Sequence, residues 1–300
     1  MRRKILFFIN PISGTRNKSS LKKEIASGCL KKGIAFEIID TAADGNYDFL
    51  QKKIREEKIT DAVIGGGDGS LRPIIAQLLH SNISVGILPL GSGNGLATAA
   101  GIPKAFDKAF EIVLNGHSAP VDAFLINEQL SCQITGLGFD AQVAHDFAKQ
   151  KKRGLNTYIK QAFKNFISAK TWLFETEIDG KSFREKAFCF CVANSNQFGN
   201  NFIIAPKASL CDGLLDIIIV KKTSKPVILF EIVKQVFLGK IKSVHEKGLE
   251  NKNILYFQTR KLTIKNSNHA PLHIDGDPCE TASEFKIEIL PAAYKLIQPV

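Results

Sequence analysis

The stretch that decides the fold is Asp61-Ala62-Val63-Ile64-Gly65-Gly66-Gly67-Asp68-Gly69-Ser70, an apolar run that ends in a glycine-rich turn. The run predicts a short buried strand, and the apolar spacing over 71–79 predicts a helix packed against it. Three consecutive glycines let the backbone approach a ligand closely and allow positive φ angles. Their N–H groups, with the start of the next helix, form a site suited to phosphate.

The turn does not follow the two commonest phosphate-binding patterns. No Lys-Ser or Lys-Thr pair follows its last glycine, and Ser70 stands where G-x-G-x-x-G needs its third glycine. A glycine-rich strand-to-helix turn on its own can equally be a simple tight turn. Asp68 is the one carboxylate in the turn, so it would lie near a bound phosphate, where metal-dependent phosphoryl transfer needs it.

Two more loops of this kind follow predicted strands. The strand over 84–88 runs into Leu90-Gly91-Ser92-Gly93-Asn94-Gly95, and the strand over 4–9 runs into Asn10-Pro11-Ile12-Ser13-Gly14. The carboxyl ends of parallel strands form one edge of a sheet, and ligands bind there. Three phosphate-suited loops on that edge favour a ligand site over simple turns.

The chain divides into two halves of different pattern. Strands and helices alternate over 4–115, which predicts an α/β domain with a parallel sheet; the strands are expected at 4–9, 34–39, 61–64 and 84–88, and the helices near 18–32, 46–57, 70–80, 94–100 and 104–114. Short β-rich segments follow from Pro120, at 121–126, 130–135, 172–178, 187–193, 214–220, 254–257, 261–265, 273–275 and 285–290. With helices over 155–169 and 227–237, they predict a β-sandwich-like second domain.

We therefore expect a nucleotide-binding domain over residues 1–119 and a β-rich substrate domain over 120–300, with the last residues able to pack back on the first domain. A cleft between domains is a common place for chemistry, so the site is expected there.

Composition is typical of a globular protein, with 44% apolar and 23% charged residues. No apolar run approaches the roughly 20 residues that span a bilayer, and no cleavable signal peptide is recognised. The six cysteines form no C-x-x-C pair. This usage indicates a reduced, cytoplasmic protein.

The formal net charge of +11 is concentrated locally. Residues 147–174 contain no acid and seven bases, which are Lys149, Lys151, Lys152, Arg153, Lys160, Lys164 and Lys170. Such an amphipathic stretch can bind an anionic membrane surface transiently, each charge contributing about 1 kcal/mol. The alternative is a solvated helix face. Nucleic acid is not expected as a partner, because no aromatic residues are interleaved with the basic ones in a recognisable motif.

The motifs together resemble the diacylglycerol kinase catalytic-domain family, which includes bacterial lipid kinases and the sphingosine and ceramide kinases. The matching motifs occur in the same order as in the family and cover essentially the whole chain. They are Asn10–Gly14, Gly66–Ser70, Pro89–Asn94, Gly136-Leu137-Gly138-Phe139-Asp140-Ala141, Ala205-Pro206, Asp212-Gly213-Leu214-Leu215-Asp216 and Asp275-Gly276-Asp277. The resemblance implies an ATP- and Mg²⁺-dependent kinase that phosphorylates a primary hydroxyl of a lipid and acts in lipid metabolism.

The same resemblance assigns the nucleotide site to the three loops and to the residue after the second strand. Its residues would be Asn10, Ser13, Gly14, Thr41, Gly66, Gly67, Asp68, Gly69, Ser70, Ser92 and Asn94. Asp68 would act through Mg²⁺ or a water bound to it.

The acceptor hydroxyl needs a base within hydrogen-bond reach. On its own, Asp275-Gly276-Asp277 is typical of an acidic β-turn. Family members carry Asp-Gly-Glu here and use its acidic residues for proton abstraction. The resemblance implies Asp275 as the base, and Asp277, one methylene shorter than the usual glutamate, remains the alternative.

For the metal, the resemblance implies Asp216 with the backbone carbonyls of Gly213 and Ile218. Oxygen ligands of this kind suit a hard cation. Asp212-Gly213 can also be a plain hairpin turn. Asp122 matches a family aspartate that is linked to the metal by water.

One departure concerns the glycine loop over 90–95. Gly95 stands where many bacterial diacylglycerol kinases have an aspartate, as in the sphingosine and ceramide kinase version of the loop. The acceptor lipid, diacylglycerol or sphingoid, is therefore left open, as is a complete aspartate–water–Mg²⁺ network.

Two other functions remain open. A nicotinamide-nucleotide kinase shares the Gly-Gly-Asp-Gly loop, but the motifs at 10–14 and 275–277 and the basic helices disfavour it. A lipid- or nucleotide-binding protein without turnover is the other, which the retained Asp68, Asp122, Asp216 and Asp275 disfavour. A homodimer is compatible with the sequence.

Overall fold

The computed structural model describes residues 3–150, 154–178, 180–198, 203–222 and 254–300. The chain forms two compact units: residues 1–122 together with 292–300, and residues 123–291. The first unit thus takes up both ends of the chain.

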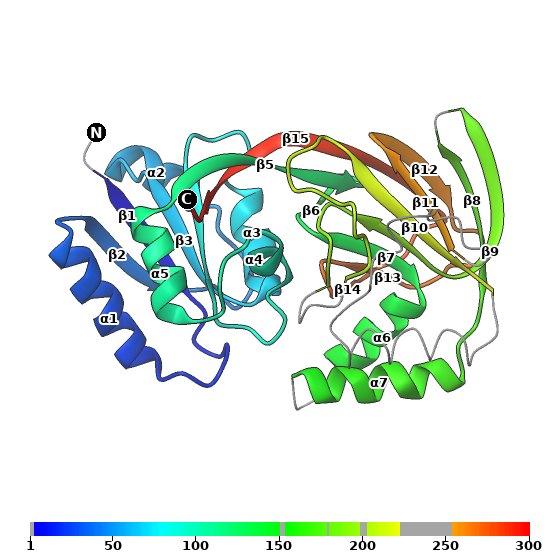
Figure 1. Ribbon diagram of the computed structural model, residues 1–300, viewed down its shortest axis with the longest axis horizontal. Helices are drawn as coiled ribbons and strands as arrows, with labels where there is room; N and C mark the ends of the chain where they lie inside the picture. The colour runs from blue at the N-terminus through cyan, green and yellow to red at the C-terminus, as the bar shows by residue number, and fades with distance from the viewer. Residues whose placement is uncertain (1–2, 151–153, 179, 199–202, 223–253) are drawn as a thin grey trace. The chain divides into compact units, whose positions relative to one another are not determined.

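The first unit has a parallel sheet (Figure 1). Its strands, in the order β2-β1-β3-β4, are β1 (Lys4–Ile9), β2 (Ala35–Asp40), β3 (Asp61–Gly66) and β4 (Ser84–Pro89). β1, β3 and β4 are buried almost throughout, as expected for the continuous apolar runs of a sheet covered on both faces.

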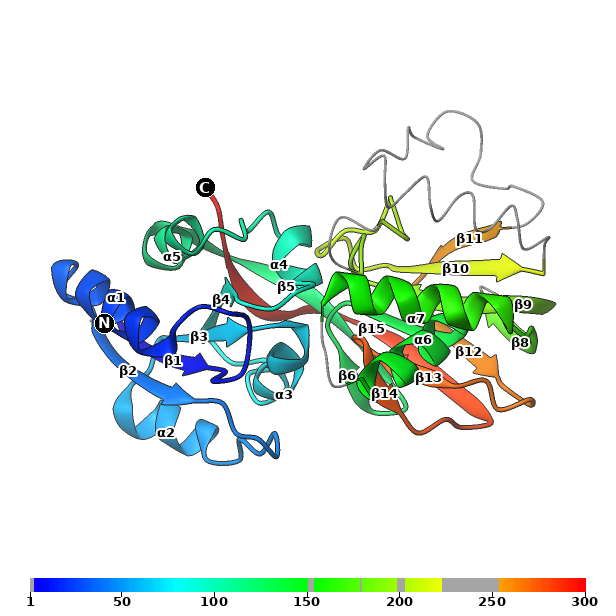
Figure 2. The same cartoon turned by 90° about the horizontal axis from the view of Figure 1, so that it is seen from below.

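Helices cover both faces of this sheet, with α1 and α5 on one side and α2 and α3 on the other (Figure 2). Their bounds are α1 (Lys18–Lys31), α2 (Leu50–Glu57), the 3₁₀ turn η1 (Asp68–Ser70), α3 (Leu71–Ala76), α4 (Gly95–Ala99) and α5 (Phe106–Asn115). Successive strand residues point to opposite faces. Accordingly Phe7 meets Phe110 of α5, with ring centroids 6.4 Å apart, whereas Phe8 meets Tyr47, at 5.5 Å.

The last strand extends the first unit's sheet. β15 (Glu284–Gln298) runs parallel to β4 at its end, where Lys295 pairs with Ser84 and Leu296 with Val85. β15 continues through Pro291, and Ala292 after it has φ +49°. Our predicted strand stopped at residue 290, because the proline breaks the apolar alternation there.

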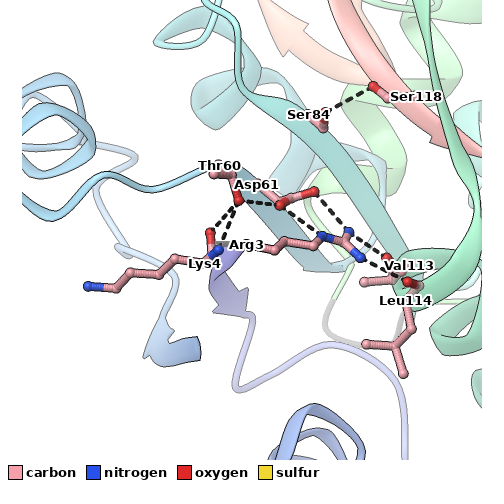
Figure 3. A network of polar contacts seen from close by, with 8 residues as sticks. All are labelled: Arg3, Lys4, Thr60, Asp61, Ser84, Val113, Leu114 and Ser118. Carbon is pink, nitrogen blue, oxygen red and sulfur yellow. Dashed lines mark hydrogen bonds and ion pairs between the residues drawn. The ribbon is translucent and has the colours of Figure 1, made fainter. Parts of the chain in front are cut away.

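A polar network joins the starts of β1 and β3 to the end of α5 (Figure 3). The Arg3 guanidinium donates to both carboxylate oxygens of Asp61, at 3.0 and 2.9 Å. It also donates to the carbonyls of Val113 and Leu114, at 2.7 and 2.8 Å. These are carbonyls of the last helical turn, which lack partners within a helix.

The second unit is a β-rich, mainly antiparallel unit. Its strands are β5 (His117–Ile126, entering from the first unit), β6 (Gln129–Ser131), β7 (Ile134–Gly138), β8 (Trp172–Ile178), β9 (Lys181–Ala193), β10 (Leu215–Lys221), β11 (Ile254–Thr259), β12 (Lys261–Lys265), β13 (Leu272–Ile274), β14 (Asp277–Cys279) and most of β15. One face of the sheet buries a large apolar cluster that includes Phe124, Phe174 and Phe190. The other face buries a smaller one, around Cys191, Ala193 and Ile218.

Among its described residues this unit has two helices that pack on each other, α6 (Phe139–Ala148) and α7 (Leu155–Ile167). α7 was predicted, and α6 was missed. The structure also divides the strand predicted over 130–135 into β6 and β7, and it ends α3 at Ala76 rather than near residue 80. The helix predicted over 227–237 lies outside the described residues.

Within the part of the chain that the structure describes, none of the helices combines the length and apolar character that crossing a bilayer requires.

Candidate active site

The three glycine loops meet at the carboxyl edge of the first unit's sheet. Asn10 follows β1, and its backbone N–H donates to the carbonyl of Gly65, at 2.8 Å. The Asn10 side-chain amide donates to Ser70 Oγ, at 2.9 Å. The carbonyl of Gly66 accepts from the N–H groups of Leu90 and Gly91, at 2.9 and 3.1 Å. Each loop is therefore hydrogen-bonded to a neighbouring loop.

Glycine is required where these loops touch. A Cβ added to Gly91 would lie 2.5 Å from the Cα of Gly67. A Cβ added to Gly14, which has φ +61°, would lie 2.4 Å from the carbonyl oxygen of Leu90. The loops pack backbone against backbone, and main-chain amides are concentrated at this edge, as a phosphate site needs.

Asp68 begins the 3₁₀ turn η1 and is partly buried. Its Oδ1 accepts from the N–H of Leu96 in α4, at 3.4 Å, so the carboxylate joins the second loop to the third. Gly69 and Ser92, at the crests of these two loops, are exposed.

Asn94 closes the third loop. It has a left-handed backbone, φ 56° and ψ 49°, and is 3% exposed. Its side chain bonds both backbone groups of Gly91, accepting from the N–H at 2.9 Å and donating to the carbonyl at 2.7 Å. The nucleotide contact that we predicted for this residue stays a prediction, and the structure shows in addition that the side chain closes the loop.

Two further predicted nucleotide residues lie at the same edge. Ser13 donates through Oγ to the carbonyl of Asn10, at 3.1 Å, which tightens the first loop. The N–H of Thr41 donates to the carbonyl of Ile9, at 3.1 Å. The residue after β2 is therefore hydrogen-bonded to the last residue of β1.

Asp122 lies where the chain leaves the first unit. It is 3% exposed, and its Oδ1 accepts from the N–H of Ala292, at 2.8 Å. Ala292 is the residue at which the chain re-enters this unit. The hydrogen bond therefore stabilises the backbone where the chain re-enters the first unit.

In the second unit, the Asp275 carboxylate holds the start of β7. Asp275 has φ +52°. Its Oδ1 accepts from Ser131 Oγ (2.7 Å), Gln133 N (2.9 Å) and Ile134 N (3.1 Å). Its Oδ2 accepts from Cys132 N, at 2.9 Å. A carboxylate with four donors is fixed in place, and its Oδ2 is the less engaged oxygen.

Asp277 begins β14 directly after this turn and is partly buried. Between the two acids, the N–H of Gly276 donates to Nδ1 of His273, at 3.2 Å. The turn is thus held both through the Asp275 side chain and through its own backbone.

Asp216 in β10 is fully buried. Its Oδ1 accepts from the Tyr256 hydroxyl and from Gln258 Nε2, the latter at 3.1 Å, whereas Oδ2 has no partner among the described residues. Burial raises the pKa of Asp216 to about 6, and the nearby Asp212 charge adds to the rise. A buried carboxylate oxygen without a donor fits a hard cation.

The other two residues predicted to bind the metal would do so through backbone carbonyls. Gly213 has φ +70° in the turn before β10. Ile218 pairs with Cys191 on one side and Tyr256 on the other, so its carbonyl is directed at a neighbouring strand. Among the described residues, no three His, Cys, Asp or Glu side chains are grouped to hold a metal.

Asp216 and Asp275 share one row across the second unit's sheet. The backbone N–H of Asp275 donates to the carbonyl of Ile134. Ile134 pairs with Ala193 on the next strand, and Ala193 pairs with Asp216 on the strand after that. At about 4.8 Å per strand, the two backbones are roughly 14 Å apart. A cation on Asp216 would therefore not touch the Asp275 carboxylate directly.

Our sequence reasoning missed a polar trio beside the turn, formed by Asp140, Cys191 and His273. Asp140 belongs to the motif 136–141, which contributed to the resemblance but received no role of its own. His273 was read only as a strand residue.

Two family models match the chain. The model described as "Diacylglycerol kinase catalytic domain" matches residues 4–126. The model described as "YegS C-terminal NAD kinase beta sandwich-like domain" matches residues 133–298.

Curated relatives and solved structures agree with these matches. A protein of Shewanella frigidimarina named "Probable lipid kinase YegS-like" is 30% identical over 81% of this chain and 78% of its own. A Bacillus subtilis protein named "Diacylglycerol kinase" is 26% identical over 89% and 88%. A crystal structure of a diacylglycerol kinase from Bacillus anthracis, 22% identical, superposes over 99% of this chain and 97% of that one, with a TM-score of 0.77.

Proposed function

The chain belongs to the lipid kinase family of diacylglycerol kinases and YegS-like proteins, and we propose that it transfers the γ-phosphoryl group of ATP to the primary hydroxyl of a lipid. The observation that carries the proposal is the hydrogen-bonded group of three glycine loops at one sheet edge. Diacylglycerol is the first candidate acceptor, and a sphingoid lipid is the second.

The nucleotide would bind with its phosphates on the loop amides. Gly67 and Gly91 carry no Cβ of their own, so the backbone of these loops would be open to close approach by phosphate oxygens. Asp68 stands among these amides and would position Mg²⁺ or its water. Phosphoryl transfer depends mainly on such positioning and on neutralising phosphate charge.

For the reaction, the lipid hydroxyl oxygen attacks the γ-phosphorus, and the bond from that phosphorus to the β,γ-bridging oxygen breaks. The hydroxyl proton passes to a carboxylate of the Asp275–Asp277 turn, and ADP leaves with the bridging oxygen. Oδ2 of Asp275 accepts one hydrogen bond from the described residues, so this oxygen has a lone pair for the proton.

Mg²⁺ is the cofactor we propose, and it would neutralise the phosphate charge. The unpartnered Oδ2 of Asp216 is the best candidate ligand on the second unit. Gly213 and Ile218 as carbonyl ligands, and Asp122 as a water-linked residue, remain predictions.

The test is phosphorylation of lipids by the purified protein with γ-labelled ATP and Mg²⁺. Diacylglycerol, sphingosine and ceramide are offered in mixed micelles, and NAD is offered in solution. We expect label in a lipid, and a loss of about 100-fold or more with Asp68→Asn. Asp48→Asn, at an exposed position of the same unit, is the matched control and should keep the wild-type rate. Label in NAD alone would reject the lipid assignment.

A membrane surface is the partner we propose for α7. Three of the seven exposed large apolar side chains of the described residues form one stripe on it: Ile159, Phe163 and Ile167, exposed by 38, 53 and 65%. Residues four apart lie on the same face of a helix. The exposed Lys160 and Lys164 flank the stripe, and α7 contains no acid. An apolar stripe beside lysines is typical of a helix that lies on anionic lipid.

Vesicle binding tests this partner. Phe163→Ser should weaken binding to vesicles that contain anionic lipid, and Lys160→Gln with Lys164→Gln should reduce its salt dependence. Leu30→Ser is the control, since Leu30 is 71% exposed on α1 in the first unit. Equal loss in the Leu30 variant would remove α7 as the specific contact. The predicted bases Lys151, Lys152 and Arg153 lie outside the described residues.

A further inference from the structure

A polar trio is buried on the face of the second unit's sheet that carries Cys191 and Ile218. Asp140 lies in the first turn of α6, Cys191 in β9 and His273 in β13, and they are 8, 1 and 2% exposed. Asp140 Oδ2 is 3.2 Å from Nε2 of His273 and accepts from the Cys191 thiol, also at 3.2 Å. Its other oxygen is buried without a partner among the described residues.

Gly136 makes room for this trio. It pairs with both His273 and Cys191 across the sheet. A Cβ at this position would lie 1.7 Å from Asp140 Oδ2 and 2.6 Å from His273 Nε2. The glycine of the motif 136–141 is therefore explained by the side chains that occupy its Cβ position.

The hydrogen bonds fix the tautomer of His273. The N–H of Gly276 can only donate, so Nδ1 of His273 accepts and carries no proton. The ring proton is then on Nε2, which donates to Asp140 Oδ2. The ring connects α6 to the backbone of the Asp275–Asp277 turn, and Asp140 orients the ring.

Stability alone does not explain these groups. A buried carboxylate with an unpartnered oxygen costs free energy, and apolar side chains of similar size would fill the space without that cost. An apolar side chain in place of His273 would provide no acceptor for the Gly276 N–H. The Gly276 N–H that needs this acceptor lies in the middle of the turn whose acids we assign to proton abstraction.

We infer that Asp140 and His273 are positioning residues that hold the Asp275-Gly276-Asp277 turn in the geometry for phosphoryl transfer. The inference rests on the proposed kinase function. The Asp275 carboxylate fixes the turn to the start of β7, and His273 fixes the next peptide, so the two contacts together set the direction of both carboxylates.

Two substitutions of His273 separate its two contacts. His273→Asn places an amide oxygen near the position of Nδ1, so it keeps an acceptor for Gly276 but cannot reach Asp140. His273→Gln reaches Asp140 with its amide but has no acceptor near Gly276. We expect kcat to fall about 10- to 100-fold in His273→Gln, since small misplacements of reacting groups have effects of this size. His273→Asn should stay within a few-fold of wild type.

Two measurements and a pair of Asp140 variants separate a positioning role from loss of structure. The KM for ATP should be unchanged in both variants, because the nucleotide loops belong to the first unit. Thermal midpoints show whether each variant is folded at the assay temperature. Asp140→Asn keeps an acceptor for Nε2 and should retain activity within a few-fold, whereas Asp140→Leu should resemble His273→Gln.

A further readout does not depend on activity. Hydrogen exchange of the Gly276 amide should be at least tenfold faster in His273→Gln than in wild type, with exchange at 132–134 unchanged. If wild-type protein phosphorylates no lipid, the proposed function fails while the exchange result still tests the contact. A His273→Gln variant with wild-type kcat, or with wild-type exchange at Gly276, would overturn the inference. So would equal losses in the Asn and Gln variants.

Discussion

The Asp275 carboxylate accepts hydrogen bonds from four donors of residues 131–134, which fixes the direction of one acid of the Asp275–Asp277 turn. The glycine loops were predictable, because consecutive glycines after an apolar run have few other uses. The four donors of Asp275 were not predictable, since they come from residues 131–134, more than 140 positions earlier. Pairings of that kind depend on the completed sheet.

Replacement of Asp275 should affect stability as well as transfer. Asp275→Asn replaces a carboxylate oxygen with an amide N–H among four donors, so we expect the free energy of unfolding to fall by about 1–3 kcal/mol, together with loss of transfer. Asp277→Asn should also lose transfer. Urea denaturation and kcat, measured on the same preparations, check both. Asp277→Glu, which restores the family's longer side chain, should remain active; an inactive Glu variant would contradict the role of this position.

The buried Asp216 predicts a pH dependence and a metal dependence. Its pKa is raised to about 6 in the folded protein, so the folded state binds its proton more tightly than the unfolded state does. Its contribution to stability is therefore present below the ordinary carboxyl pKa, about 4, and is lost as the pH rises through about 6. Asp216→Asn should reduce this loss between pH 4.5 and 7.5.

A cation on Asp216 would oppose the same loss. At pH 7.5, Mg²⁺ should raise the thermal midpoint of the wild-type protein and leave that of Asp216→Asn unchanged. Thermal scans with Mg²⁺ and with EDTA make the comparison. Equal shifts in both proteins would assign the cation to another site.

Among the elements, the ones with strong local patterns were predicted closely. β1, β8 and β12 match their predicted bounds, because the apolar run of β1 and the apolar–polar alternation of β8 and β12 end sharply. α6 was missed because it opens at Gly138, with φ +100°, in a motif that looks like a turn. The part of β15 beyond Pro291 was missed because it is stabilised by pairing with β4 rather than by its own pattern.

The contact between Arg3 and Asp61 should be important for the first unit. Arg3→Met leaves the carboxylate of Asp61, 7% exposed, without its bidentate partner, and two carbonyls at the end of α5 lose their donor. We expect a loss of about 3 kcal/mol in the free energy of unfolding by urea. Lys22→Met, which removes the exposed ion pair with Asp40, is the control and should change stability by less than about 1 kcal/mol. Similar losses in the two variants would show that burial does not strengthen the Arg3 pair.

At the scale of the whole molecule, the sequence predicted an α/β half followed by a β-rich half, and the comparisons confirm this architecture. The division between the compact units falls after Asp122, and residues 292–300 return to the first unit. Asp122 and Ala292 are hydrogen-bonded where the chain leaves and re-enters. A proline in mid-strand gives no sequence signal that the strand continues on the other side.

This return makes the first unit depend on the end of the chain. Leu296 is fully buried beside Val85 of β4, and Tyr294 and Ile297 are 2% exposed. Leu296→Ala should therefore cost about 2–5 kcal/mol of unfolding free energy, as large-to-small changes in a core do. Leu30→Ala, at an exposed apolar position of the same unit, should cost less than about 1 kcal/mol. Hydrogen exchange should speed up in β3 and β4 of the Leu296 variant before it does in β9, because the lost packing belongs to the first unit. Uniform acceleration in both units would show instead that they unfold as one, and an unchanged β4 would mean that the last strand contributes little to the sheet it joins.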